Sequence, residues 1–130
     1  MPLSSPKSVE QALGLHCILE LHGCPAALLN DKDFICQSLR EAARKANSTL
    51  LGEVSHRFEP QGATALALLA ESHISIHTWP ETGYAAVDVF TCGQDTTPRQ
   101  ACQYLIQALQ AAQHTLQVIA RGASASALKS

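Results

Sequence analysis

Apolar residues alternate with polar ones in some stretches of the chain and recur at helical spacing in others. This pattern predicts a succession of strands and helices. Residues 13–21 half-alternate between apolar and polar side chains and end at a glycine and a proline, which is typical of a strand. From Asp31 the apolar positions recur at helical spacing, with acids in the first turn and bases in the last. This pattern predicts a helix that ends at Asn47 and Ser48.

The middle of the chain predicts two hairpins. Residues 49–58 and 63–70 form the first pair of expected strands, around a Pro-Gln-Gly turn that suits antiparallel pairing. Residues 73–79 and 84–92 form the second pair, around the sequence Pro-Glu-Thr-Gly.

The last third of the chain completes the predicted architecture. A helical stripe of apolar residues follows Pro98, and a last strand is expected at residues 115–120. The order of elements predicts an α+β fold, a two-layer α/β sandwich whose mostly antiparallel sheet carries two helices on one face. The other face is then free for a ligand or a second subunit. Residues 1–12 and 122–130 are expected to be flexible.

Composition narrows the classes of protein that fit this pattern. The chain has 130 residues, so residues 1–130 are expected to form a single domain. A hydrophobic fraction of 46% beside 15% charged residues favours a homo-oligomer. A net charge of −2 without charge runs argues against nucleic acid and against an anionic membrane as partners. No segment has the length of a spanning helix or the pattern of a signal peptide, so we expect a cytoplasmic protein.

The cysteines and histidines do not define a site by themselves. Five cysteines at irregular spacing without C-x-x-C argue against a disulfide framework and against a zinc ribbon. No third ligand accompanies His73 and His77 at a recognisable spacing, so no metal site is expected. Taken alone, Cys92 is a buried thiol, and the two histidines are satisfied by neighbours on a sheet. Hydrolase, P-loop and dinucleotide signatures are absent.

Residues 71–93 concentrate reactive side chains around one turn. If Trp79 pairs with Tyr84, the alternation of side chains assigns the rest of the hairpin to two faces. The face expected to lie under the helices collects Ile74, Ile76, Ala85, Val87 and Val89. The open face collects His73, Ser75, His77, Trp79, Tyr84, Asp88 and Phe90.

The same pairing places a thiol beside one peptide bond. Glu71 falls opposite Cys92, and Ser72 falls opposite the neighbouring residue of the other strand. His77 is farther away, because the rise of a strand carries it ~16 Å from Ser72. A bend or bulge in that strand, or an imidazole from a partner subunit, is needed to close this gap.

The order of residues in this stretch is more specific than its composition. It reads E-S-H-x-x-I-H-T-W-P-E-x-G-Y-A-A-V-D-x-F-T-C-G, and H-R-F precedes it at residues 56–58. This sequence resembles the signature of the short prokaryotic S-adenosylmethionine decarboxylases, which depend on a pyruvoyl group. The order of elements over about residues 13–122 also fits the two-layer sandwich of that family.

The resemblance implies a proenzyme that cleaves itself between Glu71 and Ser72, leaving chains 1–71 and 72–130 associated. The Ser72 hydroxyl attacks the preceding carbonyl, and β-elimination then leaves a pyruvoyl group at the new N-terminus. The resemblance assigns the proton acceptor of this processing to His77. It assigns the proton donor of the later decarboxylation to Cys92.

The implied cofactor is the pyruvoyl group alone, with neither pyridoxal phosphate nor metal. Its carbonyl forms a Schiff base with the substrate amine and accepts electrons as carbon dioxide leaves. A cysteine suits the protonation step because its thiol is mostly protonated at neutral pH and is still a usable acid. Pyridoxal phosphate needs a lysine, and the chain offers only poorly placed ones in its ends and first helix: Lys7, Lys32, Lys45 and Lys129.

The implied substrate is S-adenosylmethionine, and its product is the aminopropyl donor for spermidine synthesis. The family suggests that Phe58 stacks on the adenine, that Glu81 lies near the ribose hydroxyls, and that Trp79 is close by, at a dimer interface. Thr64 stands where a serine is common, and Thr82 where a larger residue such as tyrosine is common.

Two alternatives stay open. A pyruvoyl-dependent arginine or ornithine decarboxylase of the same fold would share the processing chemistry, and only the pocket distinguishes it; the three implied substrate contacts favour a nucleoside. An unprocessed regulatory or binding subunit would have lost Ser72, His77 or Cys92, and none of them is lost.

Overall fold

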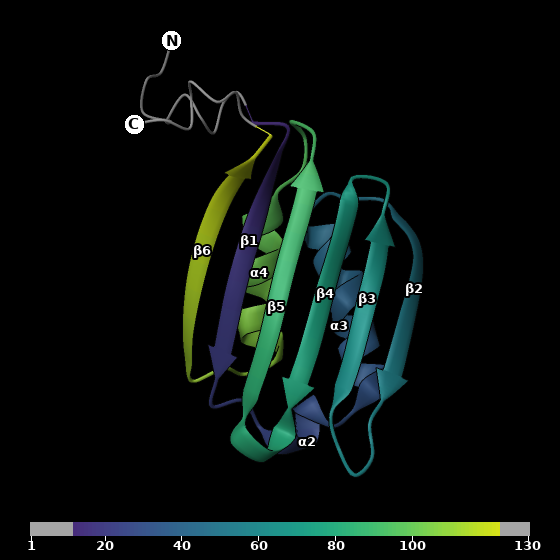
Figure 1. Cartoon of the computed structure of the whole chain (residues 1–130), viewed down its shortest axis with the longest axis vertical. Coiled ribbons are helices and arrows are strands. Elements are labelled where there is room, and N and C mark those ends of the chain that lie inside the picture. Colours follow the sequence, from purple (N-terminus) through teal and green to yellow (C-terminus); the bar gives the residue numbers. More distant parts are fainter. Residues whose placement is uncertain (1–11, 123–130) are drawn as a thin grey trace.

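The fold is built on one antiparallel sheet. The structure, a computed structural model, describes residues 12–122. Six strands in these residues pair antiparallel in the order β2-β3-β4-β5-β1-β6, as Figure 1 shows. Their bounds are β1 Gly14–His22, β2 Leu50–Arg57, β3 Ala63–Leu69, β4 Ser72–Trp79, β5 Tyr84–Cys92 and β6 Gln113–Arg121.

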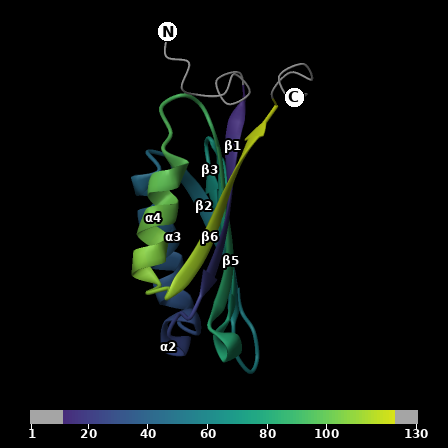
Figure 2. The same ribbon diagram turned by 90° about the vertical axis from the view of Figure 1, so that its left-hand side faces the viewer.

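In the described part of the chain, all the α-helices lie on one face of this sheet and none covers the opposite face (Figure 2). They are α2 (Ala26–Leu29), α3 (Lys32–Lys45) and α4 (Pro98–Ala108). The predicted two-layer sandwich is therefore confirmed. The count of two helices omitted α2, because four residues are too few to display a helical period.

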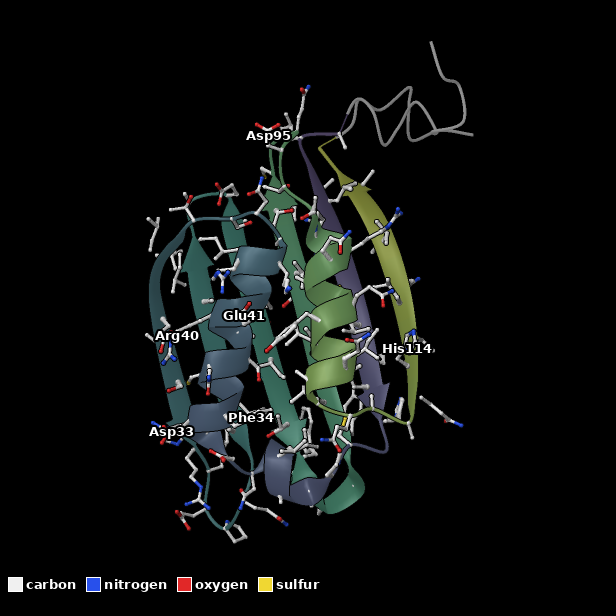
Figure 3. The ribbon with its side chains drawn as sticks, turned by 180° about the vertical axis from the view of Figure 1, so that it is seen from behind. Asp33, Phe34, Arg40, Glu41, Asp95 and His114 are labelled. Carbon is white, nitrogen blue, oxygen red and sulfur yellow. The ribbon has the colours of Figure 1, made fainter. Side chains whose placement is uncertain are left out.

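Local sequence explains where the long helices begin. The Asp31 side chain caps α3 by accepting a hydrogen bond from the backbone N–H of Phe34 at 3.0 Å, and α4 starts at the expected proline. The guanidinium of Arg40 on α3 donates to the Glu53 carboxylate on β2 at 2.8 Å. Figure 3 shows this arginine reaching from the helix toward the edge strand.

The two faces of the central hairpin are those expected from the sequence. Trp79 pairs with Tyr84, and the five apolar residues assigned to the helix side are at most 3% exposed. Each such buried aliphatic side chain favours the fold by roughly 1.5–3 kcal/mol. The open face instead exposes large apolar side chains, among them Val54, Phe58, Leu68, Trp79 and Ile119.

The boundaries differ from the sequence predictions in small ways. Strand β4 begins at Ser72, β6 begins at Gln113, and the central turn is a short 3-10 helix, η1 (Pro80–Thr82). Gly83 follows it with a φ of 68°, which suits a glycine. Except for residues 12 and 122, the ends expected to be flexible lie outside the described residues. None of the helices described is long and apolar enough to cross a membrane.

Candidate active site

The peptide bond between Glu71 and Ser72 is held at the start of β4. The carbonyl oxygen of Glu71 accepts a hydrogen bond from the backbone N–H of Cys92, at the end of β5, at 2.9 Å. The Glu71 carboxylate accepts another from the backbone N–H of Thr49 at 2.9 Å. The first of these N–H groups is aimed where negative charge develops if a nucleophile attacks this carbonyl.

The backbone at Ser72 is strained. Its φ is 150°, a region that residues with a side chain rarely adopt. Such a conformation costs on the order of 1–3 kcal/mol and persists only where the surrounding structure imposes it. Here the strain lies at the bond that the sequence predicts to break.

The Cys92 thiol is half-buried at the same end of the sheet. Its neighbour across the β1–β5 ladder is Gly14, and a Cβ on that glycine would lie 2.9 Å from the Cys92 sulfur and 2.8 Å from the Thr91 carbonyl oxygen. Only glycine therefore fits beside the thiol. A cavity of about 350 Å³ lies near this end of the sheet; Gly14, Leu15, Thr91 and Thr96 are in its lining, and Cys92 is not.

The turn end of the hairpin holds the other predicted residues. Phe58, His77, Trp79 and Glu81 all line one cavity of about 380 Å³. The Thr64 hydroxyl is hydrogen-bonded to Nδ1 of His77 at 2.9 Å, so the threonine at this position still fixes the imidazole. The Trp79 indole stacks on the Tyr84 ring, with centroids 5.2 Å apart.

These two groups of residues are not brought together within one chain. Strand β4 pairs with β3 and with β5 without a register shift, and the irregularity recorded in β2 lies between Leu50 and Gly52. The bend or bulge in β4 considered from the sequence is therefore wrong. Along a regular strand His77 stays ~16 Å from Ser72, so a partner subunit is the expected solution that remains.

A polar network occupies the middle of the open face. Oδ2 of Asp88 lies 2.7 Å from Nε2 of His16 and 3.1 Å from Nε2 of His73, and Oδ1 accepts from the Ser75 hydroxyl. Burial works to raise the pKa of Asp88, but the hydrogen bonds from Ser75, His16 and His73 outweigh it and lower that pKa overall. The carboxylate is thus held in its charged form.

The same network includes three atoms of the kind that bind metals. One possible ligand atom from each of His16, His73 and Asp88 lies within 4.8 Å of the other two. However, a guanidinium nitrogen of Arg121 lies 2.9 Å from Nδ1 of His16. A guanidinium only donates, so Nδ1 accepts and a neutral His16 carries its proton on Nε2. This arrangement favours a hydrogen-bond network over a metal site.

Several residues near the site have no signal in the local sequence. Gly14 and His16 come from β1, and Arg121 comes from β6. They reach Cys92 and Asp88 because β1 pairs with β5 on one side and with β6 on the other. Only the strand order shows this, and the hairpin pattern does not contain it.

Comparison with known proteins identifies the class that this fold and these residues define. The family model described as S-adenosylmethionine decarboxylase matches residues 15–122. The chain belongs to the S-adenosylmethionine decarboxylase family, which confirms the resemblance seen in the sequence.

Individual relatives support this assignment. The S-adenosylmethionine decarboxylase proenzyme of Prochlorococcus marinus (strain MIT 9313) is 60% identical over 109 residues, 84% of this chain and 87% of the relative. That of Caldicellulosiruptor saccharolyticus is 46% identical over 111 residues, 85% of this chain and 90% of the relative. The crystal structure of the adenosylmethionine decarboxylase from Aquifex aeolicus VF5 matches with a TM-score of 0.82 and 41% identity, over 88% of this chain and 94% of that one.

Proposed function

We propose that this chain is a proenzyme that cleaves itself at Glu71–Ser72 and then decarboxylates S-adenosylmethionine to the aminopropyl donor for spermidine synthesis. One observation carries the proposal: the strained Ser72 follows a carbonyl that already accepts a hydrogen bond from the Cys92 N–H. Membership of the family supplies the substrate class.

Processing follows from the chemistry of this bond. The Ser72 Oγ attacks the Glu71 carbonyl carbon, the C–N bond breaks, and the chain is joined by an ester with a free amine on Ser72. A base then removes the Ser72 α-proton, and the ester C–O bond breaks with release of the Glu71 carboxylate. Water replaces the nitrogen, which leaves as ammonia, and the new N-terminus is a pyruvoyl group. Relief of strain at Ser72 and stabilisation of the oxyanion by the Cys92 N–H both favour the first step.

The residues around Ser72 suit the chemistry of a pyruvoyl group, whose carbonyl would hold the substrate amine and accept electrons as carbon dioxide leaves. Cys92 would donate a proton to the substrate carbon from which carbon dioxide has left. Lys32 and Lys45 lie at the two ends of α3, on the helix side of the sheet, which fits the absence of a pyridoxal cofactor. The satisfied network at Asp88 likewise fits an enzyme without metal.

A second copy of the chain would complete each site. If two open faces stack with opposite strand directions, the turn end of one hairpin lies over the Ser72 end of the other. His77 and the cavity with Phe58, Trp79 and Glu81 would then face the partner's cleavage site. The exposed apolar side chains of this face supply the surface that such a dimer buries.

The dimer is tested by complementation during processing. We expect tagged His77→Ala chains to remain intact alone and to be cleaved when co-expressed with Ser72→Ala chains, because the latter supply His77 across the interface. Ser72→Ala chains co-expressed with themselves are the control. If the His77→Ala chains stay intact in the mixture, His77 acts within its own chain or not at all.

The activity is tested by intact mass and by release of carbon dioxide. We expect fragments 1–71 and 72–130, with a mass for the second that fits a pyruvoyl terminus. Carboxyl-labelled S-adenosylmethionine should release label in preference to labelled arginine or ornithine, also after exhaustive treatment with a chelator. A single intact chain without turnover would contradict the proposal, and preference for arginine or ornithine would replace its substrate.

A further inference from the structure

We propose that Arg121 binds the carboxylate of the substrate beside Cys92, and that Asp88 and His16 hold its guanidinium there. This inference rests on the proposed decarboxylase function and adds to it a binding residue that neither the motif nor the hairpin contains. It also gives a role to the polar network on the open face, which the proposed chemistry does not use.

Arg121 lies close to the thiol in the sheet. Gly14 pairs with Cys92 on one side and with Arg121 on the other. The position of a Cβ on Gly14 is 2.9 Å from the Cys92 sulfur and 3.0 Å from a ring carbon of Phe90. The guanidinium carbon of Arg121 lies over that same ring, 5.5 Å from its centroid. The thiol and the guanidinium thus flank one aromatic ring.

The guanidinium is held in place without being neutralised. It donates to Nδ1 of His16 at 2.9 Å, and Nε2 of His16 donates to Asp88 at 2.7 Å. Nδ1 is a neutral acceptor, and the ion pairs recorded within residues 12–122 do not include Arg121. Most of its five N–H donors therefore remain available.

No other fixed cation competes for an anion on this face. Among the strand residues that the described sheet turns away from the helices, Arg121 is the only lysine or arginine. The α-carbon that Cys92 protonates is the carbon that carries the carboxylate before decarboxylation. A substrate carboxylate beside the thiol would therefore lie close to the Arg121 guanidinium. Guanidinium groups bind carboxylates through two parallel hydrogen bonds.

The test compares ligands with and without the carboxylate. For Arg121→Gln we expect KM for S-adenosylmethionine to rise about 10- to 100-fold, the usual range for a lost hydrogen bond to a charged group, while kcat falls less. The inhibition constant of the decarboxylated product, which lacks the carboxylate, should change by less than about 2-fold. Arg121→Lys should recover part of the loss because it restores the charge, and His16→Phe should shift KM in the same direction by less. Arg44→Gln, on the helix side, is the matched control.

The outcomes separate this inference from the proposed function. Every variant in this test should still be cleaved into two fragments. A wild-type protein that is uncleaved or inactive would contradict the proposed function and not the role of Arg121. Equal weakening of both ligands by Arg121→Gln, or no weakening of either, would overturn the role of Arg121. If His16→Phe leaves KM unchanged while Arg121→Gln raises it, the carboxylate role stands and the anchoring role of His16 is wrong.

Discussion

The two ends of the β4–β5 hairpin differ in how the fold holds them. At the Ser72 end the backbone carries the function: a strained φ, a carbonyl tied to the Cys92 N–H, and a glycine that leaves room for a thiol. At the turn end the side chains carry it, with aromatic rings around an open cavity. The proposed function assigns bond chemistry to the first end and binding of a flat ligand to the second.

Under the proposed function, this difference means that one chain holds two half-sites. A regular strand keeps them ~16 Å apart, and covalent chemistry requires contact between ligand and catalyst. If two copies stack with opposite strand directions, the turn end of each hairpin lies over the Ser72 end of the other. A two-fold dimer would then contain two complete sites. The following predictions test this division.

The largest effect is expected from Ser72→Ala, which removes the attacking hydroxyl. This variant should remain one chain, with complete loss of decarboxylation, as measured by intact mass and by release of labelled carbon dioxide. Cys92→Ala is its matched control, because the backbone N–H remains when the side chain is removed. It should still be cleaved and should decarboxylate poorly; normal turnover would show that the thiol is not the acid.

A smaller effect is expected at the turn end from Phe58→Ala. Stacking on a base is worth about 1–3 kcal/mol, so KM for S-adenosylmethionine should rise about 5- to 150-fold. Cleavage at Ser72 should be unaffected because Phe58 is assigned to the ligand and supplies neither the attacking hydroxyl nor the proton acceptor of processing. Val54→Ala, exposed on the same face and outside this cavity, is the control for changes in dimerisation. Impaired cleavage in Phe58→Ala, with normal cleavage in Val54→Ala, would show that Phe58 also takes part in processing.

Between the two ends, Asp88→Asn should change stability in a pH-dependent manner. The lowered pKa of Asp88 means that its carboxylate favours the folded state above its unfolded pKa of about 3.9, and that this contribution is lost as the pH falls through the lower folded value. We expect Asp88→Asn to lose about 1–3 kcal/mol of unfolding free energy at pH 7, with the difference shrinking below about pH 4.

Urea unfolding in the uncleaved Ser72→Ala background measures this change on a single chain. Asp95→Asn, in the exposed loop before α4, is the control variant. A destabilisation by Asp88→Asn that stays the same at every pH would mean that its charge does not contribute. The network would then act through packing and neutral hydrogen bonds alone.

Most of the fold was predictable because its signals are local. The helical spacing from Asp31, the Pro98 start and the alternation from Ile74 to Val89 each depend on neighbours in sequence. They predicted the long helices and the two faces of the hairpin. The short helix α2 has no periodic signal. The strand order was not predictable, because the pairing of β1 with β5 and β6 joins segments that are far apart in the chain.

The residues of the candidate site also divide into those that the local sequence predicts and those that only the strand order shows. Ser72, His77 and Cys92 came from a motif, and the pairing of Glu71 with Cys92 came from the register of one hairpin. Gly14 and Arg121 required knowledge of which strand lies beside β5. The oxyanion contact also escaped prediction, because it is made by the backbone N–H of Cys92, which is independent of side-chain identity.

The smallest effect concerns the turn end and is spectroscopic. The hydrogen bond to Glu20, then burial and the nearby negative charge, raise the pKa of Tyr84 to about 12. The unfolded value is about 10, so this group favours folding below pH 10 and the contribution is lost as the pH rises through about 12. The chain has two tyrosines, and absorbance titration should therefore show one phenol ionising late. Tyr84→Phe should remove the late step, and Glu20→Gln should move it to lower pH. A late step that persists in Tyr84→Phe would belong to the other tyrosine. The pKa of Tyr84, whose ring stacks on Trp79, would then not be raised.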